Sequence, residues 1–331
     1  MFFSIILVAA ATFFLLYFMG GNAAGHMTGP LIGARVLTFK KAVLFSAIAV
    51  FIGALLQGHL IRAVIGKGIV SNLQADSLGV VVVLLSAAAW VCLATIFGWP
   101  VSISQSVIGS VIGYGLITNT IINWSRVATI FGSVILNPLF AAVLTIALYA
   151  GLHRFFPSDD DEKKRIWAIP LLLSTIYASY TLGANTFNSV VGVAANVMNS
   201  GWLLVGGTIA LALGILIFGK RVIKTAGFEV THINPMTAFV IQLAGALVLH
   251  VFIYLGIPST ATLAVIGATF GVGVFRKFKD NVQKNTVAQL WQSVPEKRKG
   301  TMLKILLAWF ITPIFVAGLA AALYVLLKLL I

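Results

Sequence analysis

Long apolar stretches are the feature that most constrains the fold of this chain. With 60% hydrophobic residues, 9% charged residues and a mean hydropathy of +1.05, the chain has too few charges to cover a globule in water, where about 25% is usual. Each stretch is close to the roughly 20 residues that a membrane helix needs. The stretches lie at 2–20, 40–63, 78–97, 100–118, 129–152, 167–187, 201–220, 236–256, 258–275 and 302–331. We therefore expect an all-α polytopic membrane protein.

Four sequence landmarks occur twice in the same order, at offsets of 163, 158, 158 and 175 residues. The pairs are Gly20-Gly-Asn22 with Gly183-Ala-Asn185, Gly98-Trp-Pro100 with Gly256-Ile-Pro258, Gly109-Ser-Val-Ile-Gly113-Tyr-Gly115 with Gly267-Ala-Thr-Phe-Gly271-Val-Gly273, and Asn137-Pro138 with Thr312-Pro313. Such ordered self-similarity indicates an internal repeat. We divide the chain into a first transmembrane repeat (1–155), a central cytoplasmic linker (156–166) and a second transmembrane repeat (167–331).

Each repeat contains five apolar stretches, so single crossings would turn the second repeat upside down. We therefore expect two inverted five-segment repeats with broken or re-entrant helices, a plan that is common in secondary transporters. With ten crossings and both termini outside, the inside loops are 35–41, 153–165, 220–232 and 276–304, and they contain 18 of the 22 Lys and Arg residues. This distribution satisfies the positive-inside rule and makes 276–300 a basic cytoplasmic segment. We expect a multi-pass protein of the cell (inner or plasma) membrane.

Charge and cysteine content exclude several kinds of protein. The net charge of +14 is spread between apolar stretches, which indicates membrane topology and not nucleic-acid binding. Cys92 is the single cysteine, so neither an intrachain disulfide nor a cysteine metal site can form. No cluster of carboxylates, metal ligands or nucleophile with base suggests an enzyme. The expected partners are lipid and a small ligand; a homodimer is compatible with this plan.

Small and polar residues interrupt four apolar stretches, at 20–33, 98–115, 183–196 and 256–273. In lipid, broken backbone is tolerated only where protein or a water-filled cavity satisfies the freed polar groups. Close helix packing through small residues is the alternative reading. Pro100 and Pro258 suit the first turn of a half-helix, where free N–H groups and the positive dipole end favour an anion.

We accordingly predict an oxyanion site between two half-helices. The expected substrate-binding residues are Asn22, Ser102, Ser104, Gln105, Ser106, Asn185, Thr260 and Thr262. Hydroxyl and amide groups can bind an oxyanion without a permanent positive charge, which would slow release.

These residues resemble the inorganic phosphate transporter (PiT) family, which also includes sulfate permeases. Its hallmark, Gly-Ala-Asn-Asp-x-Ala-Asn-Ala, is similar to Gly20-Gly-Asn-Ala-Ala-Gly-His-Met27 and Gly183-Ala-Asn-Thr-Phe-Asn-Ser-Val190. Its Pro-Val-Ser-Thr-Thr-His-Thr element resembles Pro100-Val-Ser-Ile-Ser-Gln-Ser106 and, in a second copy, Pro258-Ser-Thr-Ala-Thr-Leu-Ala264. Gly219-Lys-Arg-Val-Ile-Lys-Thr225 and Trp309-Phe-Ile-Thr-Pro313 resemble two further elements, so the resemblance extends along the whole chain.

The chain departs from the family pattern at the motif aspartates, which are Ala23 and Thr186 here. In sodium-coupled members, the resemblance assigns those carboxylates to cation binding. His26 stands at the motif's second asparagine, and histidine carries protons in membrane relays. A neutral hydrogen-bonded His26 is the alternative. We expect co-transported H⁺ in preference to Na⁺, and no other cofactor.

The function expected from the sequence is secondary active import of a small inorganic oxyanion by alternating access. A passive pore would lose a dianion outward, because the inside of the cell is electrically negative. We favour sulfate over phosphate, because family members for sulfate lack the aspartate. The alternatives are a sodium-coupled inorganic phosphate transporter and an anion channel.

Overall fold

The computed structural model describes residues 2–99, 101–156, 166–195, 197–226, 234–280 and 296–330. The linker prediction at 156–166 and the basic segment at 276–300 therefore lie largely outside the described residues, as does Pro100. Within the described residues the protein is helical, and strand pairing is limited to an isolated bridge between Val70 and Ile122.

The helices of the described residues follow one another along the chain. They are α1 (Phe2–Met27), α2 (Gly29–Gly33), α3 (Phe39–Leu56), α4 (Gly58–Lys67), a 3₁₀ turn (Leu73–Ala75), α5 (Ser77–Phe97), α6 (Ile103–Ile117), α7 (Trp124–Phe155), α8 (Ala168–Leu182), a π-helix (Gly183–Phe187), α9 (Asn188–Ala194), α10 (Ser200–Ala226), α11 (Pro235–Tyr254), α12 (Ala261–Asp280) and α14 (Glu296–Leu330). Seven of those in the described part, α1, α3, α5, α7, α10, α11 and α14, contain stretches long and apolar enough to cross a membrane.

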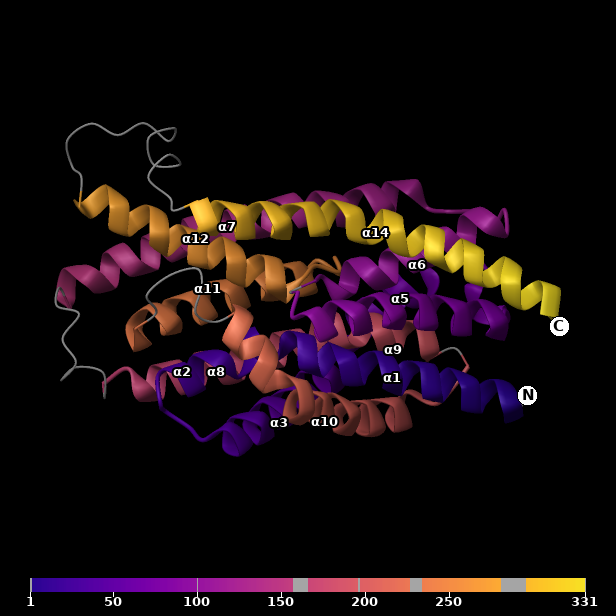
Figure 1. Ribbon diagram of the computed structural model, residues 1–331, viewed down its shortest axis with the longest axis horizontal. Coiled ribbons are helices and arrows are strands. Elements are labelled where there is room, and N and C mark those ends of the chain that lie inside the picture. The colour runs from indigo at the N-terminus through magenta and orange to yellow at the C-terminus, as the bar shows by residue number, and fades with distance from the viewer. Residues whose placement is uncertain are drawn as a thin grey trace.

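Two pairs of helices form hairpins that approach each other from opposite ends of the molecule. In Figure 1, α5 and α6 lie in the right half of the view and α11 and α12 in the left half, and the helices of each pair pack together. The expectation of ten single crossings therefore differs from the structure, because each hairpin returns to the end from which it came. Each hairpin consists of two segments that enter and leave at the same end, so it does not change the end at which the chain continues. Both termini therefore still lie at the same end of the molecule, on the right in Figure 1.

Helices from the two halves of the chain pack in reciprocal pairs. The first helix, α1, packs against α10, and α8 packs against α3; likewise α6 packs against α14, and α12 against α7. Helices in lipid associate through close packing and polar contacts, because burial of apolar surface gives little driving force there.

Glycines allow the closest of these approaches. A Cβ atom added at Gly109 would lie 2.4 Å from the Pro313 carbonyl oxygen, and one added at Gly267 would lie 2.1 Å from the Pro138 carbonyl oxygen. The same offsets that relate the sequence landmarks relate these two contacts. The glycine pairs noted in the sequence thus lie at equivalent helix crossings.

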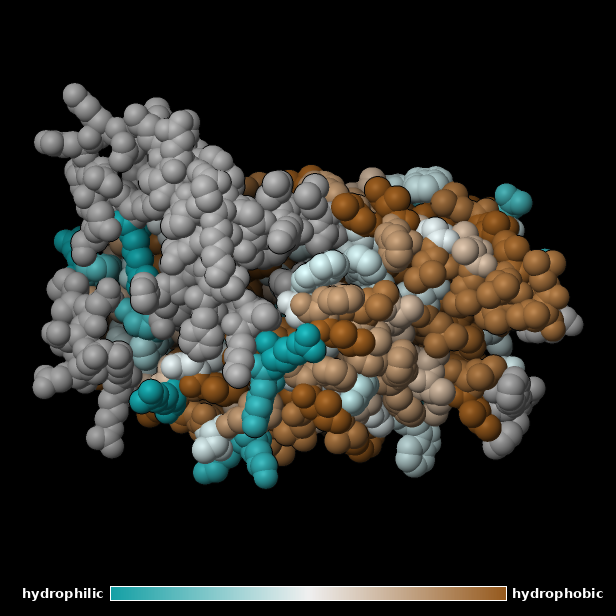
Figure 2. All heavy atoms as spheres, viewed as in Figure 1, coloured by the Kyte–Doolittle hydropathy of each residue, from teal (hydrophilic) through white to brown (hydrophobic). Residues whose placement is uncertain are grey.

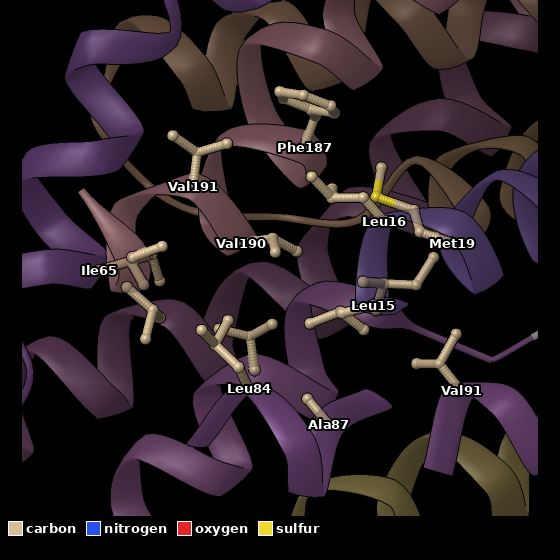
Figure 3. Packing of buried hydrophobic residues seen from close by; sticks show 14 of the residues in the cluster. Leu15, Leu16, Met19, Ile65, Leu84, Ala87, Val91, Phe187, Val190 and Val191 are labelled. Atoms are coloured by element: carbon tan, nitrogen blue, oxygen red, sulfur yellow. The ribbon is translucent and has the colours of Figure 1, made fainter. Parts of the chain in front are cut away.

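A buried apolar cluster joins both halves of the chain. Figure 3 shows part of it, with side chains from α1, α4, α5, the π-helix and α9. Its members include Leu15, Leu84, Phe187 and Val191, each of which is fully buried. This packing fixes α1 and α9, the helices next to the two polar motifs.

The outer surface is strongly apolar over much of its length. In Figure 2 hydrophobic side chains dominate the right part of the visible face, whereas hydrophilic side chains gather toward the left. Helix α7 exposes Leu139 and Phe140, and α14 exposes Phe310 and Ile314. Exposed apolar surface of this extent requires a lipid environment.

Candidate functional site

The tips of the two hairpins are the centre of the candidate site. We call the described residues of 98–102, which are 98, 99, 101 and 102, the first tip and residues 255–260 the second tip. Helices α6 and α12 begin at these tips near the middle of the molecule and run to opposite ends (Figure 1). Gly98 and Gly256 turn the chain with φ values of 71° and 65°, a left-handed conformation that glycine adopts without steric cost.

Asn22 attaches the first tip to α1. Its Nδ2 donates to the Trp99 carbonyl oxygen at 2.8 Å and to Thr95 Oγ1 at 3.4 Å. Its Oδ1 accepts the backbone N–H of Val101 at 3.3 Å. The carboxamide therefore satisfies polar backbone groups that a broken helix leaves free in the core.

Asn185 attaches the second tip to the π-helix in a similar way. Its Nδ2 donates to the Ser259 carbonyl oxygen at 2.7 Å, and its Oδ1 accepts the Ser259 N–H at 3.3 Å. Val101 and Ser259 are equivalent positions at the offset of 158 found in the sequence. Both motif asparagines thus hold backbone of a tip, and their expected contact with substrate stays a prediction.

The hydroxyl groups at the start of α6 fall into two kinds. Ser102 Oγ accepts the Gln105 N–H at 3.3 Å and caps the helix, and Ser106 Oγ donates to the Ser102 carbonyl oxygen at 2.9 Å. Ser104 Oγ and Gln105 Oε1 are buried and have no hydrogen-bond partner among the described residues. A hydroxyl has one proton, so Ser104 is better placed than Ser106 to donate to a ligand.

The second tip carries buried hydroxyl groups at the start of α12. Thr260 and Thr262 are 2% and 7% exposed. The expectation that Pro258 lies in the first turn of the helix is wrong, because α12 begins at Ala261. Pro258 precedes the helix because the following Ser259 has both backbone polar groups bound to the Asn185 side chain, outside the helical pattern.

Asn137 holds the second tip from outside it, and in the sequence it stood out only as a repeat landmark. It lies in α7, is fully buried, and donates from Nδ2 to Ser259 Oγ at 2.7 Å and to the Thr260 carbonyl oxygen at 2.9 Å. Its Oδ1 has no partner among the described residues. The signal in the sequence was a carboxamide inside an otherwise apolar stretch.

His26 lies in the last turn of α1, four residues after Asn22 and so on the same side of the helix. Its carbonyl oxygen accepts a hydrogen bond from Gln242 Nε2 at 2.7 Å. The ring Nε2 is buried without a partner in the described part of the chain. The imidazole is thus partly buried, with its Nε2 atom inside the protein, one turn beyond the asparagine that holds the first tip.

The motif aspartate positions contain no acid. Ala23 is fully buried, and Thr186 is 3% exposed with its Oγ1 unpartnered in the described structure. Asp76 accepts a hydrogen bond from the Tyr114 hydroxyl at 2.9 Å, at the start of α5 and far along the chain from the tip. Within the described residues, no group of His, Cys, Asp and Glu side chains could hold a metal ion.

A comparison with family models decides what kind of protein this is. The model of the phosphate transporter family matches residues 19–173 and 156–320. The chain belongs to the phosphate transporter family. This confirms the phosphate transporter part of the resemblance seen in the sequence, and nothing in the comparisons supports the sulfate-permease branch.

Relatives within the phosphate transporter family match nearly the whole chain. A "Putative phosphate permease" of Chlamydia pneumoniae is 25% identical, with 94% of this chain and 99% of the relative covered. A protein of the same description from Pyrococcus abyssi is 25% identical, with 92% and 93% covered. A solved structure described as "The sodium-dependent phosphate transporter" superposes with a TM-score of 0.85 at 21% identity, covering 99% of this chain and 100% of the other, which shows a shared fold.

Proposed function

We propose that this phosphate transporter family member imports inorganic phosphate across the cell membrane as a secondary active transporter. Family membership and the relatives named as phosphate permeases support phosphate. The sulfate preference expected from the sequence has no such support, so phosphate replaces it as the leading substrate. The observation that carries the proposal is the pair of tips, each opening a helix with buried hydroxyl groups.

Phosphate would bind between the starts of α6 and α12. Ser102, Ser104, Thr260 and Thr262 supply hydroxyl groups there, and helix N-termini favour anions through free N–H groups and the helix dipole. Asn22 and Asn185 would act mainly by holding the backbone of the two tips. Neutral donors bind the anion without the strong charge pairing that would slow its release.

Alternating access would follow from two inverted repeats related by a pseudo-two-fold axis. The reciprocal packing of α6 on α14 and α12 on α7 supports this relation. The matching contacts of Gly109 with Pro313 and Gly267 with Pro138 support it further. Transporters with inverted repeats bind substrate near mid-membrane, where their broken helices meet.

Phosphate entry requires a driving cation. Moving a monoanion into a cell at ~150 mV, inside negative, costs roughly 3.5 kcal/mol, from about 2.3 kcal/mol per charge per 100 mV. Sodium is the first candidate, because the structural neighbour is described as sodium-dependent. Protons carried through His26 are the second, supported by its unpartnered buried Nε2 and by Ala23 and Thr186 in place of the motif aspartates.

Reconstitution into proteoliposomes tests the function and the coupling ion together. We expect uptake of radioactive phosphate above its equilibrium level when sodium is higher outside at equal pH, and competition by unlabelled phosphate more than by sulfate. Accumulation driven only by an acid-outside gradient would instead identify proton coupling. Uptake that equilibrates without accumulating under either gradient would identify a channel, and absence of phosphate uptake would refute the proposal.

A further inference from the structure

The buried carbonyl of Asn137 is a polar group for which the described residues provide no partner. The side chain is fully buried in α7, and its Oδ1 has no hydrogen-bond partner among the described residues. Buried polar atoms in proteins are nearly always hydrogen-bonded, because leaving one unpaired is costly. A buried acceptor beside a binding site therefore suits a donor on the ligand or a bound cation.

The orientation of the Asn137 carboxamide follows from its neighbours. The Thr260 carbonyl oxygen can only accept, so the amide atom 2.9 Å from it must be the nitrogen. The same nitrogen donates to Ser259 Oγ at 2.7 Å. Both N–H groups of Asn137 are then used within the second tip, and its oxygen can only accept.

Ser259 completes a complementary pair with Asn137. Its Oγ accepts from Asn137 Nδ2, which leaves the hydroxyl proton free to donate to an anion. Thr260 and Thr262 add buried hydroxyl donors at the start of the same helix. The second tip thus presents several donors and one acceptor.

Phosphate and sulfate differ in the group that such an acceptor recognises. Near neutral pH, phosphate carries at least one P–OH group, whereas sulfate has four bare oxygens. An acceptor oxygen binds the P–OH proton but repels an oxygen of sulfate, and a mismatched group in a desolvated site discriminates strongly.

We propose that Asn137 is the specificity-determining residue of this site, with Oδ1 accepting a hydrogen bond from the P–OH group of phosphate. The inference rests on the proposed phosphate function and assigns its selectivity to one atom. It explains why the carboxamide oxygen is buried without a partner among the residues that the structure describes.

Monofluorophosphate tests this without any substitution. It is a tetrahedral dianion in which P–F replaces P–OH, so it cannot donate to Asn137. Purified wild-type protein, measured by competition against radioactive phosphate, should bind monofluorophosphate and sulfate about 10–100-fold more weakly than phosphate, the range for one lost hydrogen bond to a charged group. Equal binding of phosphate and monofluorophosphate would overturn the inference.

The Asn137→Ser variant separates recognition from structural support. It removes Oδ1 together with both amide donors, so every anion should bind more weakly. The ratio of the dissociation constants of monofluorophosphate and phosphate should at the same time fall toward one. The matched control is Asn185→Ser, because Asn185 also holds Ser259 but uses both of its amide atoms on that residue's backbone. It should weaken all anions by a common factor and keep the wild-type preference.

The outcomes distinguish this inference from the proposed function. A preference in Asn137→Ser equal to that of wild type would refute the role of Oδ1 while leaving phosphate transport intact. If Asn137→Ser fails to fold, equal binding of phosphate and monofluorophosphate by the wild-type protein would still overturn the inference. Failure of wild-type protein to bind phosphate would refute the proposed function itself.

Discussion

Asn22 accepts a hydrogen bond from the backbone N–H of Val101, across 79 positions of the chain, at 3.3 Å. Asn185 accepts one from Ser259 at the same distance in the second half. Each half of the chain therefore uses its motif asparagine to hold the turn of its own hairpin. The two tips owe their backbone conformation to these side chains, since a broken helix in lipid must find other hydrogen-bond partners.

Replacing Asn22 should loosen the first tip. Asn22→Ala leaves the Trp99 carbonyl and the Val101 N–H without their partner, which should cost about 1–3 kcal/mol of stability and reduce phosphate affinity. Thermal unfolding in detergent and phosphate binding measure the two effects. Thr12→Val is a suitable control, because Thr12 Oγ1 bonds only within α1, to Val8, and its loss should cost less. Equal stability of Asn22→Ala and wild type would contradict the structural role.

Ser104 and Ser106 should behave differently when they are truncated. Ser104→Ala removes a hydroxyl that has no partner in the described part of the chain, so phosphate affinity should fall roughly 10–150-fold while the melting temperature is unchanged or slightly higher. Ser106→Ala removes a bond to Ser102 inside α6 and should affect affinity little. Isothermal titration of phosphate measures both. A larger loss of affinity for Ser106→Ala would place the anion elsewhere.

Two glycines of α12 predict opposite effects of an added methyl group. Gly267→Ala would put a Cβ 2.1 Å from the Pro138 carbonyl oxygen, so α7 and α12 must separate, at a cost of about 1–3 kcal/mol. Gly273 has no atom within 4 Å of its added Cβ, so Gly273→Ala should be neutral or stabilising by up to about 1 kcal/mol. Melting temperatures in detergent compare the two variants. A Gly267→Ala protein as stable as wild type would argue against this helix crossing.

The orientation of the chain can be tested with single cysteines in a Cys92→Ser background. Ser125 is exposed near the start of α7, at the end that carries the termini, and Lys40 is exposed near the start of α3, in a predicted inside loop. A membrane-impermeant maleimide should label Ser125→Cys in intact cells and Lys40→Cys only after permeabilisation. The reverse pattern would mean that both termini lie inside.

The sequence predicted the helices well because hydropathy and length are local properties. The apolar stretches at 78–97 and 236–256 match α5, Ser77–Phe97, and α11, Pro235–Tyr254, within two residues at each end. Broken or re-entrant helices were expected, but the plan of ten crossings did not identify α5 and α11 as segments that turn back, because a stretch of this length has the same composition whether it crosses or enters a hairpin. The turns at Gly98 and Gly256 depend on partners from distant helices.

The candidate site was predicted in part. The residue types at both tips were identified because polar groups within an apolar, membrane-embedded stretch are energetically costly and therefore mark candidate functional positions. Which of them have free atoms was not predictable: Ser104 and Ser106 are alike in the sequence, and only the helix geometry gives Ser106 a carbonyl partner. The contribution of Asn137 depends on the packing of α7 against α12, and a hydropathy profile does not predict which helices pack together.

Neutrality of the tips has a consequence for the electrical behaviour of transport. Among the described residues, the side chains that hold and line the tips are hydroxyls and carboxamides, with no net charge. The membrane potential does work only on charge that moves, at about 2.3 kcal/mol per charge per 100 mV. Reorientation of the empty transporter between its outward-facing and inward-facing states would then not depend on the membrane potential, because its site carries no net charge. The net charge moved per cycle would then equal the summed charge of the transported ions. Transport of one sodium ion with monovalent phosphate would be electroneutral, and a second sodium ion would make uptake electrogenic.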